Sequence, residues 1–496
     1  MDDRVLLLPI LLPALVAAAL SLRRFKGRTG FCAFVVAAVF LNSALLLRLA
    51  AHPPRGTLTL LHLSRDLSLA LRLDGAGAAF AALLACLCPF VALYGLGYMS
   101  RTPHRDKPFF VCFALAYGAA AGVALAANLT TLCLFCQLLL LAVLPITRRE
   151  GQRIAEVAFS LPLGWGVFCT LLSLAFATAF IGNVDFVPGG CLPADALRKP
   201  DLLYLIYLLG FLGFGLETAV LPLRGWPVAS AEAPAPASAL LNAVAVANAG
   251  VFAIIRLTWY VFGPNALNGS WAHLAAFALA CVTTVYGACM ALSSQRLKLR
   301  LAWSTIGQLA YVLLGTLLLT PSGLSAGMTQ MAAHALIKAN LYFCAGAILC
   351  QSGRRFLFDM RGWGFGMPAT FLAFLLSALA LVGLPPMVGF IAKWRLGVAA
   401  ASAGASSPIG FFGLAAMLTS ALLTTFYVLQ VLCVAVMPGR GFNLRAANYG
   451  ITDPGPAMLI PIGLLAASAL LLGLWAEPVL GFFERAVPGT LPEAIP

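Results

Sequence analysis

Long apolar stretches alternate with short polar connections along almost the whole chain. There are 14 of them, at residues 4–22, 30–50, 75–98, 109–126, 129–147, 154–182, 202–222, 237–261, 271–292, 299–319, 325–350, 368–394, 408–437 and 457–482. About 20 helical residues span the hydrocarbon core of a bilayer. The pattern therefore predicts an all-α polytopic membrane protein of about 14 transmembrane helices, with residues 1–496 as one membrane domain.

Two segments need separate interpretation. Residues 51–73 are amphipathic and too polar to span, so we expect a hairpin or a surface helix outside the membrane. The first apolar stretch lacks a basic start and a clear cleavage site, which favours a retained helix over a removable signal.

Composition excludes several classes of protein. Of the 496 residues, 61% are hydrophobic and 10% are charged, a balance foreign to soluble domains. An outer-membrane barrel would alternate polar and apolar positions, which this chain does not. The net charge of +14 comes from basic residues scattered over short connections. That distribution predicts contact with a lipid bilayer and no binding of nucleic acid.

The basic residues also predict an orientation. Taking alternate connections along the chain, one set holds 19 lysines and arginines and the other holds 9. Basic residues concentrate on the cytoplasmic side of membrane proteins. The bias predicts a multi-pass protein of the inner (cytoplasmic) membrane with both termini on the non-cytoplasmic side.

Proline breaks accompany two of the ionisable residues inside the apolar stretches. Glu217 precedes Pro222, and Lys393 follows Pro385 and Pro386. A charge in the bilayer interior costs several kcal/mol, about 3 on insertion scales, unless it is paired or hydrated. Broken helices leave free backbone groups that hold water or ions. We therefore interpret Glu217 and Lys393 as members of an ion path.

Further candidate residues in or next to the apolar stretches are His334, Lys338 and Arg395. His334 and Lys338 are four residues apart and share one face of a predicted helix. Histidine exchanges protons near neutral pH, so this pair suits a proton relay. For Lys338 and especially Arg395, an open alternative is a purely structural bond to backbone at a helix break.

No pattern in the chain predicts a metal or a cofactor. Cys133 and Cys136 form a CxxC, and Cys86 and Cys88 a CxC, but both lie in apolar stretches without a second pair or a nearby histidine. Buried, small, apolar cysteines are the better interpretation. No P-loop, dinucleotide fingerprint or iron–sulfur motif is present.

Several motifs occur in an order that resembles one family, the antiporter-like membrane subunits of respiratory complex I, group 4 membrane-bound hydrogenases and Mrp-type cation/proton antiporters. These motifs are DGAGAAF at 74–80, YGLGYM at 94–99, NLTTLCLFCQL at 128–138, LPLRGWP at 221–227, EAPAPASALL at 232–241, NAGVFAIIR at 248–256, LAWSTIGQLAYVLLG at 301–315, HALIKANLYFCAGAI at 334–348 and GLPPMVGFIAKW at 383–394.

The resemblance implies a fold of 14 helices with two inverted five-helix repeats. Helices 4–8 would form repeat 1, about residues 109–261, and helices 9–13 repeat 2, about 271–437. Helices 7 and 12 are broken in this family, which matches Pro222 and the Pro385–Pro386 pair.

The resemblance also implies a polar axis across the membrane centre, with one position on each of several helices. These positions are Gln137, Glu217, Asn248, His334, Lys338 and Lys393. The family expects glutamate, lysine and lysine at the first three. A family histidine near the first break is replaced by Arg224, and another on helix 11 by Gln330. Gln137, Asn248 and Arg224 are therefore candidate polar partners rather than proton carriers.

Two interpretations of the altered first half remain open. In one, the carboxylate has moved from helix 5 to helix 7, so that Glu217 titrates and Gln137 hydrogen-bonds to it. In the other, the first half conducts no protons and is structural or passes something else.

The resemblance implies an ion-translocating subunit, most simply for protons and alternatively for sodium, in the membrane arm of a redox-driven complex I-like or hydrogenase-like assembly. Its partners would be other membrane-arm subunits and a peripheral redox arm, in which Fe–S clusters, a NiFe centre or quinone would reside. The alternatives are an Mrp-type secondary cation/proton antiporter and a non-pumping structural subunit. Whether the chain is part of an enzyme stays open, since it holds no redox centre of its own.

Overall fold

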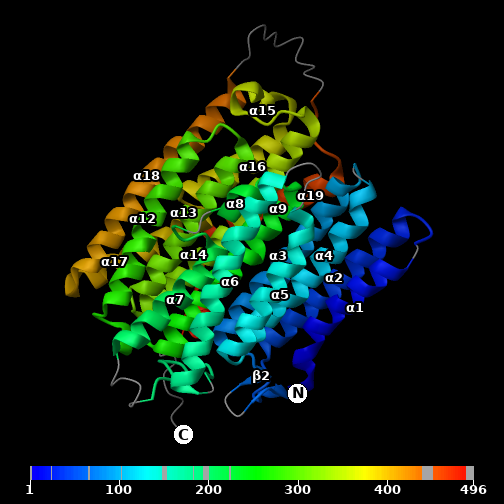
Figure 1. Cartoon of the computed structure of the whole chain (residues 1–496). Coiled ribbons are helices and arrows are strands. Elements are labelled where there is room, and N and C mark those ends of the chain that lie inside the picture. The colour runs from blue at the N-terminus through cyan, green and yellow to red at the C-terminus, as the bar shows by residue number, and fades with distance from the viewer. Residues whose placement is uncertain are drawn as a thin grey trace.

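Helices lie side by side in one bundle that accounts for nearly all of the chain (Figure 1). This computed structural model describes residues 3–23, 25–64, 67–101, 103–147, 153–182, 184–193, 200–222, 225–437 and 451–487. The helices of the first half are η1 (Asp3–Leu7), α1 (Leu8–Leu22), α2 (Arg28–Ala51), α3 (Gly75–Met99), α4 (Pro103–Leu125), α5 (Leu129–Thr147), α6 (Arg153–Ile181), α7 (Pro200–Thr218), α8 (Gly225–Ser230), α9 (Ala235–Ala239), η3 (Leu240–Val244), α10 (Val246–Arg256), η4 (Leu257–Phe262) and α11 (Pro264–Leu267).

The second half continues the bundle. Its helices are α12 (Trp271–Ser293), α13 (Leu297–Leu317), α14 (Pro321–Ser352), η5 (Leu357–Met360), α15 (Trp363–Gly366), α16 (Pro368–Val382), α17 (Val388–Ser406), α18 (Pro408–Val436), α19 (Pro456–Leu474) and α20 (Glu477–Ala486).

The all-helical membrane fold predicted from the apolar stretches is confirmed. Within the described residues, 12 helices are long and apolar enough to cross a membrane. The two remaining apolar stretches also form helices: one corresponds to α13, and the other corresponds to α16 and α17, which are separated by a break. The number of crossings and the inverted repeats stay predictions. The predicted end of the stretch 368–394 is wrong, because α17 continues to Ser406. Its last residues are mostly alanine, glycine and serine, which are weakly apolar, and alanine is a strong helix former.

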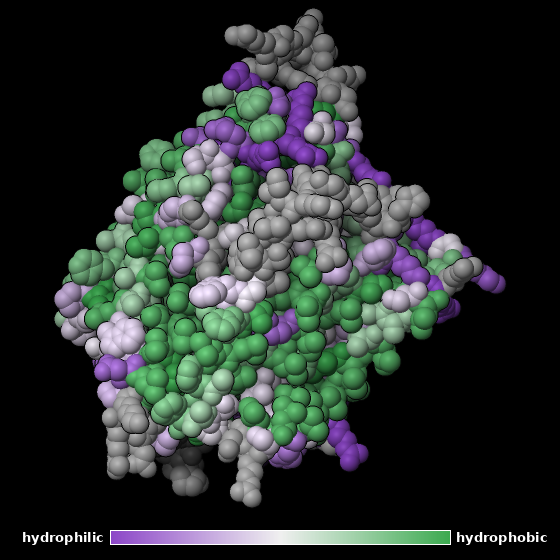
Figure 2. Space-filling model, in the orientation of Figure 1, coloured by the Kyte–Doolittle hydropathy of each residue, from purple (hydrophilic) through white to green (hydrophobic). Residues whose placement is uncertain are grey.

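A broad apolar surface surrounds the bundle. Figure 2 shows hydrophobic side chains across the middle of the visible face and hydrophilic ones gathered near α15 and along the edges. Many of the exposed side chains are large and apolar, among them Leu141, Phe168, Leu372, Phe412 and Leu418. Such a surface suits a lipid environment, where apolar groups face outward.

The segment predicted to lie outside the membrane forms a hairpin, one of the two forms expected. Strands β1 (Leu58–His62) and β2 (Ser68–Leu71) pair in antiparallel register. The amide of Ala70 donates to the Thr131 hydroxyl at 2.9 Å, and the amide of Ala127 donates to the Ala70 carbonyl at 3.0 Å. These bonds fix the hairpin on the connection between α4 and α5.

A buried ion pair joins two motifs that are far apart in the sequence. Asp74 caps α3 by accepting from the Gly77 amide at 2.9 Å. Arg256, at the end of α10, is buried. Its guanidinium donates two hydrogen bonds to the same carboxylate, one of them 2.6 Å long. Its guanidinium also lies 4.5 Å from the centre of the Tyr260 ring. Burial alone would raise the pKa of Asp74, but the charge and hydrogen bonds of Arg256 outweigh it and hold that pKa below its usual range.

We expect Asp74→Asn to lower the free energy of unfolding by about 3 kcal/mol, because it leaves the Arg256 guanidinium buried without its counter-ion. Asparagine keeps an oxygen that can cap α3, so the change isolates the charge. Thermal unfolding in detergent measures the effect. A lowered carboxyl pKa stabilises the fold above the unfolded-state value, so the difference from wild type should shrink as the pH falls through the folded pKa.

Glu477→Gln is the matched control, because Glu477 is exposed in the first turn of α20. It should change stability by no more than about 0.5 kcal/mol. Equal stability of Asp74→Asn and Glu477→Gln would contradict a structural role for the ion pair.

Candidate functional site

The first helix break lies between α7 and α8, as predicted from Pro222. Helix α7 ends at Thr218, and Ala219 adopts a left-handed φ of 60°, a conformation uncommon for a residue with a side chain. The amide of Val220 donates to the Gly215 carbonyl at 2.8 Å, and the Trp226 indole donates to the Leu216 carbonyl at 2.6 Å. These bonds satisfy backbone groups that the ended helix would otherwise leave unpaired.

The second break, predicted from Pro385 and Pro386, lies between α16 and α17. Helix α16 ends at Val382, and the φ of 92° at the following residue, Gly383, suits glycine after a helix C-terminus. The Lys393 ammonium donates to the carbonyls of Leu381 at 2.6 Å and Val382 at 3.1 Å. A lysine thus caps the negative end of the helix dipole, where the last carbonyls lack helical partners. The Leu221–Pro222 and Pro385–Pro386 peptide bonds are both cis.

Glu217 lies buried in the last turn of α7. The thiol of Cys136 on α5 is its hydrogen-bonding neighbour, and the Oε2 atom has no partner among the described residues. The backbone of α10 passes close by, since a side chain at Gly250 would lie 2.5 Å from the Glu217 Cβ. No described basic residue forms an ion pair with this carboxylate. Gln137, the partner of Glu217 in one of the two interpretations, is only half-buried and lies one position along the helix from Cys136.

Lys338 is fully buried in α14 and bonded to α13. Its ammonium donates to the Leu301 carbonyl at 3.0 Å and to the Ser304 hydroxyl. Lys393 is near enough for the two ammonium charges to interact, and α14 packs on α17. Both lysines are therefore held by uncharged oxygen atoms rather than by carboxylates.

His334 lies one turn before Lys338 but contacts a different element. Its Nε2 atom lies 3.5 Å from the Asn242 carbonyl in the π-helical turn η3, and its Nδ1 atom has no partner among the described residues. One turn earlier on the same face, the Gln330 amide donates to the Gln308 side chain at 3.0 Å. Helix α14 thus carries a polar row formed by Gln330, His334 and Lys338.

Asn248 stands in α10 immediately after a π-helical turn. Its amide donates to the Ala243 carbonyl at 2.6 Å, and its Oδ1 atom has no described partner. Asn242, within η3, donates to the Ser230 hydroxyl at 2.7 Å and the Ser238 carbonyl at 3.1 Å. Single π-helical turns are frequent at functional sites. Arg224, the remaining candidate, lies outside the described residues.

Three residues gained importance only from the structure. Arg256 and Arg300 are not among the candidate residues that the sequence predicts, yet both are buried. The Arg300 guanidinium donates to the carbonyls of Ser294 at 2.8 Å and Tyr427 at 2.8 Å, which joins the end of α12 to α18. Cys136 was interpreted as an apolar residue and proves to be the neighbour of Glu217.

These features define a helical membrane protein in which two interrupted helices hold ionisable side chains deep in the bundle. The family model for the transmembrane region of NADH:quinone oxidoreductase and Mrp antiporter proteins matches residues 126–419. That match includes both breaks, and the chain belongs to this family of antiporter-like subunits.

Individual relatives agree with the family. The chain is 28% identical over 434 residues to NADH-quinone oxidoreductase subunit N of Desulforudis audaxviator (strain MP104C), covering 82% of this chain and 83% of that protein. Its fold is similar to a chain of the Mrp complex from Dietzia sp. DQ12-45-1b, with a TM-score of 0.80, 18% identity and coverage of 98% and 97%. It is also similar to a chain of an archaeal membrane-bound sulfane sulfur reductase, with a TM-score of 0.83, 20% identity and coverage of 97% of each.

Ser304→Ala tests how Lys338 is held. Loss of a hydrogen bond to a charged group should lower the free energy of unfolding by about 1.5–3 kcal/mol. The matched control is Ser325→Ala, because the Ser325 hydroxyl is equally buried and has no hydrogen-bond partner among the described residues. Thermal unfolding in detergent compares the two. A loss for Ser325→Ala as large as that for Ser304→Ala would contradict a specific bond to Lys338.

Proposed function

We propose that this chain translocates ions, specifically protons, as a subunit of the membrane arm of a redox-driven complex I-like or hydrogenase-like assembly. The proton carriers are Glu217, His334, Lys338 and Lys393. The chain supplies the path, and partner subunits of a peripheral redox arm supply the Fe–S, NiFe or quinone chemistry that drives it.

The position of Lys393 is the observation that carries this proposal. Its ammonium lies at the α16–α17 break and is bonded to two backbone carbonyls, without a carboxylate partner among the described residues. An ammonium held by neutral oxygens can release its proton without leaving a buried carboxylate unpaired. Ionisable residues beside helix breaks at membrane depth are a feature of ion pathways.

His334 provides a step between the two halves. Because a carbonyl only accepts, the Nε2 atom facing the Asn242 carbonyl carries the hydrogen, and Nδ1 is then an acceptor. That nitrogen can take up a proton while the ring stays in place. A proton on His334 would repel the ammonium of Lys338 one turn away, which favours movement of charge along α14.

The first half would use a single carboxylate. Glu217 has no basic partner among the described residues, and Cys136 offers a weak, neutral hydrogen bond. A lone carboxyl group in this setting can alternate between charged and neutral forms. Asn248 and Gln137 carry amide side chains, which do not titrate, and would not carry protons themselves.

We also propose an orientation of the chain in the membrane. The hairpin side of the molecule holds both ends of the described chain, since a side chain at Gly56 would touch Asp3 and one at Gly75 would touch Ala486. Arg296, Lys298, Arg354 and Arg355 gather around one cavity elsewhere. This distribution supports placement in the inner membrane with both termini on the non-cytoplasmic side.

Lys393→Ala should abolish proton uptake by proteoliposomes that contain the purified complex. The control is Arg395→Ala, which removes a cation two residues away that pairs with Glu484 of α20 and lies off the path. Uptake should persist in that control. Wild-type uptake by Lys393→Ala would overturn the proposal.

Glu217→Gln should reduce proton uptake at least about tenfold while leaving the assembly intact, because glutamine keeps the shape but cannot titrate. Asp201→Asn makes the same kind of change at the exposed start of α7 and should have little effect. A Glu217→Gln complex that pumps normally would show that the first half is structural.

Partner subunits distinguish the alternatives. Co-purification with Fe–S or hydrogenase-like subunits agrees with the redox-driven assembly. Co-purification with small Mrp-type subunits alone would replace it with a secondary cation/proton antiporter.

A further inference from the structure

Three buried polar side chains of the first half lie outside the proposed ion path. They are Ser230 at the end of α8, Ser238 in α9 and Asn242 in η3, and each is fully buried. A buried polar group costs free energy unless it is hydrogen-bonded. The bonds of these three side chains converge on the π-helical turn that faces His334, so the turn and the histidine belong to one arrangement.

The junction between η3 and α10 places a backbone carbonyl beside the His334 ring. The turn ends with a bond of 2.8 Å from the Ala245 amide to the Leu240 carbonyl, and α10 begins at Val246. The five-residue spacing of that bond is the spacing of a π-helix. Carbonyls at the end of a helical element can accept from side chains. The Nε2 atom of His334 lies 3.5 Å from such a carbonyl, that of Asn242.

The side chain of Asn242 fixes this turn to α8. Its amide group donates to the Ser230 hydroxyl at 2.7 Å and to the Ser238 carbonyl at 3.1 Å. Two acceptors match the two hydrogens of an asparagine amide. Because the side chain and the carbonyl belong to the same residue, holding the side chain restrains the direction in which the carbonyl points.

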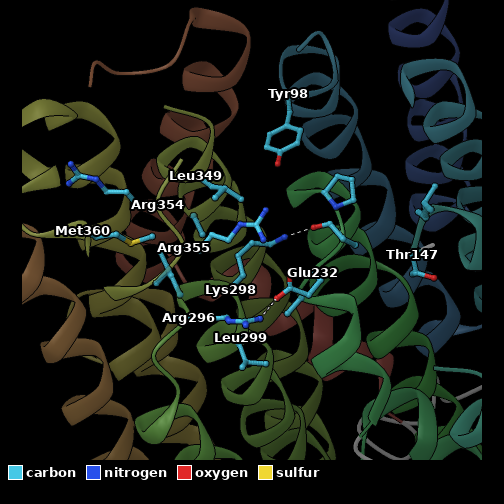
Figure 3. Close-up of a pocket in the computed structure, with 16 residues that line it drawn as sticks. Tyr98, Thr147, Glu232, Arg296, Lys298, Leu299, Leu349, Arg354, Arg355 and Met360 are labelled. Carbon is cyan, nitrogen blue, oxygen red and sulfur yellow. Dashed lines mark hydrogen bonds and ion pairs between the residues drawn. The ribbon is translucent and has the colours of Figure 1, made fainter. Parts of the chain in front are cut away.

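Ser238 fixes the connection between α8 and α9. Its hydroxyl can donate to the Ser230 carbonyl at 3.0 Å or to the Ala233 carbonyl at 3.2 Å. Residues 231–234 of this connection form part of the wall of a cavity of about 240 Å³ (Figure 3). Since Ser238 reaches carbonyls at both ends of the connection, it keeps Ser230 in place beside η3.

Helix α8 is itself tied to the first helix break. The Trp226 indole donates to the Leu216 carbonyl at 2.6 Å, and Leu216 directly precedes Glu217. Trp226 and Ser230 are four residues apart and therefore share one face of α8. A continuous series of hydrogen bonds and packed residues thus runs from the break beside Glu217, through α8 and η3, to His334 in the second half.

We propose that Asn242 is a positioning residue for His334, held by Ser230 and Ser238 so that its carbonyl keeps the ring hydrogen on Nε2 and leaves Nδ1 to take up a proton. The inference rests on the proposed role of His334 in the ion path. The hydrogen bond at one ring nitrogen determines which form the other nitrogen takes. Elements of the first half therefore set the form of a proton carrier in the second half.

Nitrogen nuclear magnetic resonance of the histidine-labelled chain in lipid bilayers tests this, because the two neutral forms of imidazole have different nitrogen shifts. The chain has five histidines, and subtraction of the His334→Gln spectrum assigns the His334 signals. At mildly alkaline pH, wild type should carry the hydrogen on Nε2. Asn242→Ala should shift the ratio of the two forms about fivefold toward Nδ1, the effect of losing one neutral hydrogen bond.

Asn340→Ala is the matched control. Asn340 is also a fully buried asparagine, on the same helix as His334, and its amide donates to the Ser377 hydroxyl of α16 at 2.7 Å. This variant loses a bond of the same kind and length, so its thermal stability should fall by a similar amount. The hydrogen of His334 should nevertheless stay on Nε2.

Ser230→Ala removes the same bond from its other side and keeps Asn242, so it should shift the forms in the same direction. Thermal unfolding shows whether each variant is folded, and Ser230→Ala decides the matter if Asn242→Ala does not fold. Unchanged forms in the folded variants, or an equal shift in Asn340→Ala, would overturn the proposal. The nitrogen shifts are read without any measurement of transport. Normal uptake by Lys393→Ala would therefore remove the proposed function and leave this result intact.

Discussion

A cation deep in a membrane protein must be surrounded by oxygen atoms, and in this molecule the backbone supplies most of them. Lys393 takes two carbonyls where α16 ends, and Lys338 takes one carbonyl and one hydroxyl from α13. The last carbonyls of a helix have no helical donor, so the break after α16 leaves two of them free for Lys393. Lys338 instead shares the second lone pair of a carbonyl in the continuous helix α13.

The two halves meet this constraint in different ways. In the second half, ammonium groups occupy the free oxygens. In the first half, the break after α7 is closed by amide and indole donors, and the nearby carboxylate of Glu217 faces a thiol. The reversal of charge at residue 217 thus accompanies a different distribution of donors and acceptors, although the shape of the break is retained.

The helices and their breaks could be predicted from the sequence, because each depends on a local property of the chain. Apolar length predicted the helices, and proline predicted both breaks. Contacts between segments that are distant in the sequence could not be predicted, because they depend on how the helices pack. Arg256 and Arg300 carry no sequence signal for their contacts, because only the tertiary structure brings Asp74 to one and the carbonyls of Ser294 and Tyr427 to the other. Likewise, one of the two interpretations of the first half has Gln137 hydrogen-bonded to Glu217, whereas the structure presents the Cys136 thiol to it. One residue along a helix is a turn of about 100°, which periodicity alone does not resolve.

Arg300 also fixes how the second half can deform. Its guanidinium bonds to the last carbonyls of α12 and to a carbonyl of α18, while its own backbone belongs to α13. Three helices are thus fastened at one level by a residue that cannot lose its charge at physiological pH. A second tie lies at the opposite end of α12 and α13, where the His273 ring is 2.7 Å from the Leu317 carbonyl. Sliding of α12 past α13 would therefore break polar contacts at both ends, so these two helices can move only as a unit.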